Sequence, residues 1–241
     1  MSTIADNISN VGSRIQTATQ AAHRPENSVQ LLAVSKTKPA EALREAYAAG
    51  LRDFGENYLQ EALGKQLELA DLPLIWHFIG PIQSNKTRAI AEHFDWVHSV
   101  DRLKIAQRLS EQRPAELPPL NICIQVNVSG EASKSGCTPA DLPALAEAIS
   151  ALPRLKLRGL MAIPEPTDDR AEQDAAFAAV QKLQASLELP LDTLSMGMSH
   201  DLESAIAQGA TWVRIGTADS RSYSLIVSKA ATTGSPTFKV S

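Results

Sequence analysis

The chain has 241 residues, 44% of them hydrophobic and 21% charged, a balance that is typical of a globular protein and gives no argument for disorder. Its formal net charge of −4 leaves no basic excess, which argues against nucleic acid and anionic membranes as partners. Two cysteines do not make a disulfide framework, and no signal peptide or bilayer-spanning run is present. These features predict a cytoplasmic protein. Cys123 lies in an apolar run and is expected in the core, whereas Cys137 follows a glycine and is expected in a loop.

Short apolar runs alternate with longer helical patterns along the chain. A short apolar run bounded by turn residues predicts a strand, and a longer amphipathic stretch with capping residues predicts a helix. The expected strands cover residues 29–35, 52–55, 74–79, 96–99, 120–128, 155–163, 193–196 and 212–216. The expected helices cover residues 39–49, a stretch from about 58, 86–93, 101–112, 140–151, about 170–187 and 199–207, two of them capped by Asp101 and Ser199.

This alternation predicts parallel strands, because each strand is followed by a helix that returns the chain. About eight such units in an α/β chain of this length predict a single closed (β/α)8 TIM barrel, with an extra N-terminal helix before the first strand. An open doubly wound sheet is the main alternative, but the G-x-G-x-x-G turn of its dinucleotide-binding form is missing.

Functional side chains of such a barrel lie where strands end and loops begin. The predicted strand ends of this chain are unusually polar, whereas the strand starts are not. The polar strand-end residues are Lys36, Glu56, Asn57, His77, Asn127, residues 195–199 and residues 214–217. This asymmetry favours a functional site over random surface polarity.

Lys36 closes the apolar run 31–35. Burial disfavours the ammonium form, so we expect a lowered pKa and a nucleophilic amine at this position. Such an amine can form a Schiff base with an aldehyde, and pyridoxal phosphate is the commonest aldehyde cofactor. The alternative is a lysine that extends its ammonium group into solvent.

Two turns after the last two strands suggest a phosphate site. In the run 195–199, Gly197 allows close approach of the backbone, and the first amides of the following helix are unpaired donors. Gly216 and Thr217 form a second small turn, and the loops after strands seven and eight are the usual phosphate site of this fold. The alternative is that Ser199 only caps its helix and Gly216 only ends its strand.

Arg214 lies within a strand that should be buried, and a buried guanidinium keeps its proton and needs acceptors. Strand periodicity places Trp212, Arg214 and Gly216 on one face. If that face looks into the barrel, Arg214 can donate to a ring nitrogen of a bound cofactor; the alternative is an ion pair with Glu56 or another barrel carboxylate. His77 can line the pocket or form hydrogen bonds within the barrel, and we favour the second. No histidine or cysteine spacing predicts a metal site.

Several stretches together resemble the pyridoxal phosphate homeostasis protein family. They are LLAVSKTKP (31–39), FGENY (54–58), WHFIGPIQSNK (76–86), SKSG (133–136), RGLMAIP (158–164), LSMGMS (194–199) and VRIGTA (213–218). The resemblance covers about residues 4–218 and implies the barrel of alanine racemase and fold-type III decarboxylases. After residue 218 the chain departs from the family pattern, so we expect a barrel domain at 1–218 and a divergent tail at 219–241.

The resemblance also implies residue roles. Lys36 corresponds to the lysine that carries pyridoxal 5'-phosphate as a Schiff base, Arg214 faces the pyridine nitrogen, and Asn57 and His77 lie in the pocket. The phosphate is held by Ser199, Gly216 and Thr217, with the backbone of Met196, Gly197 and Met198.

A racemase and a cofactor carrier share this barrel, so the fold does not decide between them. Racemisation needs acid/base groups on both faces of the substrate, and an arginine opposite the ring nitrogen makes the ring a poor electron sink. We therefore expect a non-catalytic, monomeric carrier that acts in intracellular homeostasis of pyridoxal phosphate, with apo enzymes that depend on this cofactor as partners. The alternatives are a weak amino-acid racemase or decarboxylase, and an aldolase that uses Lys36 on a sugar phosphate.

Overall fold

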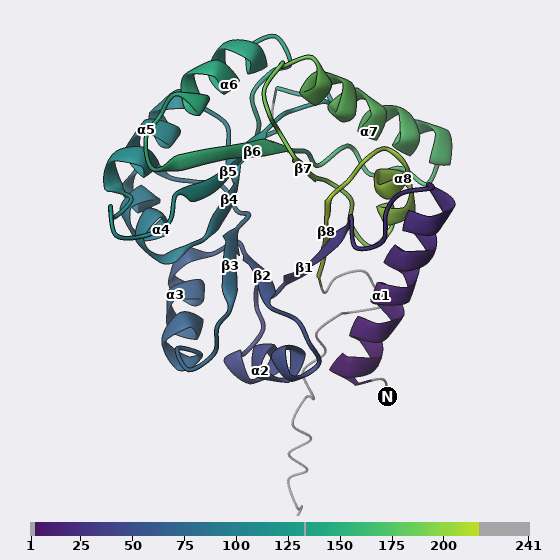
Figure 1. Ribbon diagram of the computed structural model, residues 1–241, viewed down its shortest axis with the longest axis horizontal. Helices are drawn as coiled ribbons and strands as arrows, with labels where there is room; N and C mark the ends of the chain where they lie inside the picture. Colours follow the sequence, from purple (N-terminus) through teal and green to yellow (C-terminus); the bar gives the residue numbers. More distant parts are fainter. Residues whose placement is uncertain (1–2, 133, 217–241) are drawn as a thin grey trace, which may run out of the picture.

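The computed structural model describes residues 3–132 and 134–216. Its strands pair in sequence order, all parallel, and close into a barrel (Figure 1). The strands are β1 (Gln30–Val34), β2 (Asp53–Glu56), β3 (Ile75–Phe78), β4 (Trp96–Val100), β5 (Leu120–Gln125), β6 (Leu155–Met161), β7 (Thr193–Ser195) and β8 (Trp212–Ile215). The predicted TIM barrel is confirmed, and the open sheet is excluded because β1 pairs with β8.

Helices surround the barrel (Figure 1). They are α1 (Ile4–Ala21), α2 (Ala40–Ala48), α3 (Leu59–Glu68), α4 (Thr87–His93), α5 (Leu103–Gln112), α6 (Leu142–Ser150), α7 (Arg170–Ala185) and α8 (Leu202–Ala207), with a 3-10 turn η1 (Ser84–Lys86). The expected N-terminal helix, α1, packs against both α8 and α2. It therefore fills the place in the helical ring that lies outside β8 and β1.

The sequence of α1 explains this docking. Thr3 and Asp6 form a capping box at its start, which satisfies two backbone amides that a helix otherwise leaves unpaired. Ile4, Val11 and Ile15 are buried at helical spacing and form one apolar face. This apolar face allows α1 to pack against its neighbours in the helical layer, α8 and α2.

The apolar core has two parts. The larger part lies between the outer face of the sheet and the helices. The smaller part, formed by Trp96, Cys123 and Met161, comes from β4, β5 and β6 and lies inside the barrel. Gly159 allows β6 to approach β7, because a Cβ atom at this position would lie 1.7 Å from the carbonyl oxygen of Thr193.

Two predicted helix caps are wrong. The N-cap of α5 is Arg102 and not Asp101, because the backbone of Arg102 is still extended. The N-cap of α8 is Asp201 and not Ser199, and α8 has only six residues. The Asp201 carboxylate accepts a hydrogen bond from the Met198 amide, which closes a turn before the helix begins.

The fifth strand is shorter than the predicted run 120–128. β5 ends at Gln125, and Val126 then pairs with Cys137 in an isolated bridge. Cys137 is accordingly buried by its pairing with the chain after β5 and is no incidental loop residue. Cys123 lies in the core as predicted.

Some sequence features lie outside the described residues: Ser133 of the SKSG stretch, Thr217 and the proposed tail 219–241. Within residues 3–132 and 134–216, no helix is both long and apolar enough to cross a bilayer.

Candidate functional site

The predicted site residues meet at one end of the barrel. Lys36 lies two residues beyond β1, Asn57 directly follows β2, Gly197 lies two residues beyond β7, and Gly216 directly follows β8. In the closed barrel, β7, β8, β1 and β2 are successive neighbours, so these four strand ends lie side by side. A Cβ atom on Gly216 would lie 3.0 Å from the Cβ atom of Val34, so the end of β8 packs directly against the end of β1.

Lys36 stands in a tight turn after β1 and is half-buried, in contrast to the buried lysine expected from the sequence. The Lys38 amide donates to the carbonyl oxygen of Ser35 at 3.1 Å across this turn. Thr37 has a φ of 62°, a left-handed conformation that is strained for a β-branched residue. Lys38 is half-buried too, and burial lowers the pKa of its amine. Two half-buried lysines therefore lie two residues apart in this turn.

A buried ion-pair network, here the Lys65 cluster (Ser35, Glu56, Glu61 and Lys65), supports the turn. The Lys65 ammonium donates to Glu56 Oε1, Glu61 Oε1 and the carbonyl oxygen of Ser35, at 2.7, 2.7 and 2.6 Å. Glu61 also accepts from the backbone amide of Thr37. The cluster thus holds the residues on both sides of Lys36, although none of its members was a sequence-predicted site residue except Glu56.

Glu56 is fully buried in this cluster. Its Oε1 atom also accepts from the Ser35 hydroxyl at 2.7 Å, whereas its Oε2 atom is buried without a partner among the described residues. Burial raises the pKa of Glu56 in spite of the hydrogen bonds from Lys65 and Ser35. Because Glu56 pairs with Lys65, the alternative ion pair between Glu56 and Arg214 is wrong.

Arg214 faces the barrel interior, which is the orientation it needs in order to donate to a bound cofactor. Its side chain donates to Ser195 Oγ at 2.8 Å and to the carbonyl oxygen of Ala162 at 3.1 Å. Burial lowers the pKa of the guanidinium to about 10, an effect opposed by the charge of the Asp201 carboxylate. The group stays protonated near neutral pH and has further N–H donors beyond these two contacts.

His77 is fully buried and bonds within the barrel, which confirms the favoured interpretation. One ring nitrogen, Nε2, lies 2.8 Å from Asp53 Oδ1, and the other, Nδ1, lies 2.9 Å from Nε2 of His98. The rings of Trp96 and Trp212 pack on the imidazole of His77. With both ring nitrogens engaged, His77 has no free nitrogen for a ligand.

His98 was not among the residues predicted from the sequence; its Nδ1 atom lies 2.8 Å from Ser195 Oγ. A signal was present, because His98 alternates with Trp96 on β4 and so shares its face. Asp53 was overlooked because it lies at the start of its strand, the end where no function was expected.

The proposed phosphate turn is less open than the sequence suggested. The Met196 amide donates to the carbonyl oxygen of Trp212 and the Met198 amide to Asp201, so both are already engaged. Gly197 has a φ of 98° and its missing Cβ would lie 2.5 Å from that of Ala205. Among the described residues, the amides of Gly197 and Ser199 have no hydrogen-bond acceptor, so these are the donors left for an anion.

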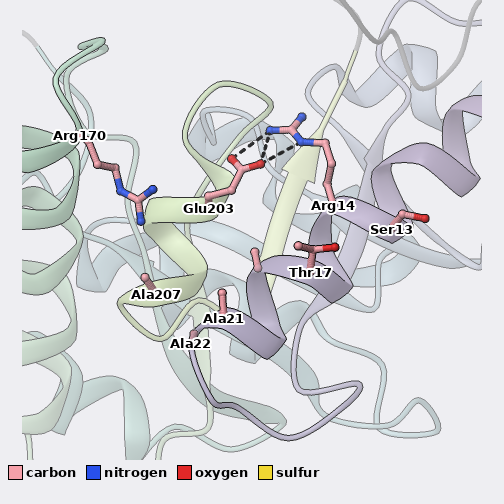
Figure 2. A pocket seen from close by; sticks show the side chains of 9 residues that line it. Ser13, Arg14, Thr17, Ala21, Ala22, Arg170, Glu203 and Ala207 are labelled. Carbon is pink, nitrogen blue, oxygen red and sulfur yellow. Dashed lines mark hydrogen bonds and ion pairs between the residues drawn. The ribbon is translucent and has the colours of Figure 1, made fainter.

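Arg14 connects helix α1 to this turn (Figure 2). It donates to the carbonyl oxygen of Ser199 at 3.0 Å and forms a bidentate pair with Glu203 of α8. Beside this pair lies a cavity of about 510 Å³. It is bounded by α1 and α8, with Arg170 of α7 at its edge, and not by the strand ends, so it lies in the helical layer and not at the barrel mouth.

The donor set suits an anionic aldehyde with a heteroaromatic ring. Lys36 supplies an amine, Arg214 a guanidinium, and Gly197 and Ser199 supply amides. The Oδ1 atom of Asn57 is buried without a partner among the described residues, which costs about 1–3 kcal/mol unless a ligand engages it. The residues present therefore fit a phosphorylated cofactor of the kind expected from the sequence.

Comparisons with known sequences agree with this geometry. The family model described as "Alanine racemase, N-terminal domain" matches residues 7–219. A Pseudomonas aeruginosa protein named pyridoxal phosphate homeostasis protein is 78% identical over 218 residues, which cover 90% of this chain and 95% of the relative. A protein of the same name from Escherichia coli (strain K12) is 53% identical over 232 residues, covering 93% and 99%.

Solved structures give the same result. PipY of Synechococcus elongatus PCC7942, with pyridoxal phosphate (PLP) bound, is 45% identical with a TM-score of 0.76, covering 88% of this chain and 97% of that one. An alanine racemase from Corynebacterium glutamicum is 17% identical with a TM-score of 0.59, covering 85% of this chain and 58% of the racemase. The racemase likeness concerns the fold alone.

Proposed function

Because the chain belongs to the pyridoxal phosphate homeostasis protein family, we propose that it binds pyridoxal 5'-phosphate and helps to keep the level of this coenzyme in balance. The observation that carries the proposal is the amine of Lys36, held in a strained turn at the barrel mouth by a buried ion-pair cluster. The bound PipY relative supports the choice of cofactor. The curated relatives are named for homeostasis and not for a reaction, in agreement with the expected absence of catalysis.

We propose the following roles for the site. When bound, pyridoxal phosphate supplies an aldehyde that condenses reversibly with a primary amine to a Schiff base, and Lys36 is that amine. Arg214 faces the pyridine nitrogen and, as a permanent donor, keeps that nitrogen an acceptor. Asn57 bonds the ring edge through its unpartnered oxygen, and His77 is connected to Arg214 through His98 and Ser195.

The phosphate is held on the turns after β7 and β8. We assign it to the amides of Gly197 and Ser199, the Ser199 hydroxyl and Gly216. Met196 and Met198 contribute shape and not amide donors, since both amides are engaged. Thr217 stays a proposal from the sequence, because it lies outside the described residues.

The wider setting is also proposed. The two cysteines, which make no disulfide framework, support action in the cytoplasm. We propose that the protein is a monomer and that apo enzymes that depend on pyridoxal phosphate are its recipients. We also propose that the barrel domain covers residues 1–218 and that residues 219–241 form a separate tail.

Absorption spectra of the chain mixed with pyridoxal phosphate test the assignment. We expect a visible band in the wild type, its loss in Lys36→Ala and its retention in Lys38→Ala, the matched control two residues away. Borohydride reduction followed by peptide mapping should label Lys36. A band that survives in Lys36→Ala, or a label on Lys38, would contradict the assignment.

A second assay separates the carrier from the alternative racemase or decarboxylase. The loaded chain is incubated with L-amino acids in deuterium oxide, and exchange of the α-proton is followed by NMR. We expect no exchange above that of free pyridoxal phosphate. Robust exchange that depends on Lys36 would instead favour catalysis.

A further inference from the structure

A continuous line of hydrogen bonds crosses the barrel interior. We name it the interior chain; its members come from β2, β3, β4, β7 and β8 and are Asp53, His77, His98, Ser195 and Arg214. The successive donor–acceptor distances are 2.8, 2.9, 2.8 and 2.8 Å. It runs from the carboxylate at the start of β2 to the guanidinium that we propose to contact the cofactor. The sequence did not predict that these five side chains are connected.

The two ends of the interior chain determine its direction. A guanidinium can only donate hydrogen bonds, and a carboxylate can only accept them. A neutral imidazole donates through one nitrogen and accepts through the other. One arrangement satisfies every link: Arg214 donates to Ser195, the Ser195 hydroxyl donates to His98 Nδ1, His98 Nε2–H donates to His77 Nδ1, and His77 Nε2–H donates to Asp53.

The surroundings favour neutral imidazoles. His77 and His98 are both fully buried, and Trp96 and Trp212 pack on them. Burial lowers the pKa of both rings, for His77 against the opposing charges of Asp53 and Asp95, and for His98 together with the charge of Arg214. The carboxylate end is the more exposed one: the Asp53 side chain is 22% exposed, whereas Arg214 is 4% exposed and the three residues between them are fully buried.

We propose that Asp53, at the end of the barrel opposite Lys36, is a positioning residue for Arg214. It holds both imidazoles as Nε2–H tautomers, and these turn the hydroxyl hydrogen of Ser195 away from the guanidinium. Arg214 then keeps a fixed acceptor and presents its remaining N–H groups in one orientation. The part of this inference that concerns the cofactor rests on the proposed function; the tautomers do not.

The direct test is a long-range ¹H–¹⁵N NMR spectrum of the cofactor-free chain. The signals of the two buried rings are told apart from those of the exposed His23, His93 and His200 by substituting each histidine in turn. We expect His77 and His98 to show protonated Nε2 and unprotonated Nδ1 between pH 6 and 8. A protonated Nδ1 on either ring of the wild type would overturn the proposal.

Two substitutions locate the source of the polarity. In Asp53→Leu the acceptor is gone, and we expect both imidazoles to populate a mixture of tautomers. In Ser195→Ala the carboxylate end is intact, and we expect both to stay Nε2–H. Asp71→Leu, which removes an exposed carboxylate paired with Arg44, is the matched control and should change nothing. Unchanged tautomers in Asp53→Leu would overturn the role of Asp53.

The cofactor provides a readout that a structural role alone would not move. We expect Asp53→Leu to be labelled on Lys36 by borohydride as the wild type is, but with a shifted visible absorption maximum. A maximum identical to that of the wild type would refute the link to Arg214. If the wild type itself bound no cofactor, the proposed function would fail, but the tautomers of the two imidazoles would still test the direction of hydrogen bonding in the interior chain. If Asp53→Leu did not fold, the spectra of the wild type and of Ser195→Ala would still test that direction.

Discussion

Removal of the central cation of the Lys65 cluster should destabilise the barrel strongly. In Lys65→Met the three hydrogen bonds of the ammonium group are lost, and a fully buried carboxylate, Glu56, remains without its counter-ion. Loss of one partner of a buried ion pair costs about 3–5 kcal/mol in free energy of unfolding. The contribution of Glu61 is smaller, since its side chain is 29% exposed and screened by water.

Urea unfolding followed by tryptophan fluorescence measures this cost. For a domain of this size, about 2–4 °C in Tm accompanies each kcal/mol, so Lys65→Met should melt roughly 6–20 °C below the wild type. Lys182→Met is the matched control, because Lys182 is exposed and should change the free energy by less than about 0.5 kcal/mol. The double variant Lys65→Met/Glu56→Gln should recover part of the loss, because the buried charge is gone.

A loss below about 1 kcal/mol in Lys65→Met would refute the reasoning, because such a value is typical of an exposed pair. The same holds if the double variant is no more stable than Lys65→Met. Cofactor loading links the cluster to the site: Glu61→Gln weakens the bond to the Thr37 amide and should slow the reaction of Lys36 with pyridoxal phosphate.

Three further predictions follow from the burial of titratable groups and from the contacts of α1. Below pH 6.5 the unfolded chain binds protons that the buried imidazoles do not, because burial lowers the pKa of both rings in the folded chain. The free energy of unfolding should therefore decrease as the pH is lowered below 6.5, by up to about 1.4 kcal/mol per pH unit for each ring, and His98→Gln should reduce this slope by the share of one ring. Burial raises the pKa of Cys123 to about 12 and of Cys137 to about 11, so neither thiol should react with a thiol reagent at pH 8 until the chain is unfolded. Arg14→Ala removes the bond to Ser199 and should weaken binding of pyridoxal phosphate while Lys36 is still labelled.

Each of these predictions has a contrary outcome. Equal slopes in wild type and His98→Gln between pH 5 and 6 would show that the ring titrates normally in the folded chain. Rapid labelling of either cysteine in the folded chain would show an accessible thiolate. An unchanged cofactor affinity in Arg14→Ala would separate α1 from the phosphate turn.

Local patterns determined much of this protein. The alternation of apolar runs and helical stretches is a short-range signal, and it was enough for the closed parallel barrel and the N-terminal helix. Because parallel strands all end on one side, the strand-end positions of Lys36, Asn57, Gly197 and Gly216 also predict that these residues lie together.

Only the tertiary structure decided which polar groups satisfy one another. Glu56 pairs with Lys65 of a helix and not with Arg214, while Arg214 is connected to Asp53 through Ser195 and two imidazoles, from residues up to 161 positions apart in sequence. Such partners depend on barrel closure and on burial, where an unpaired polar group is costly, and neither periodicity nor spacing records them.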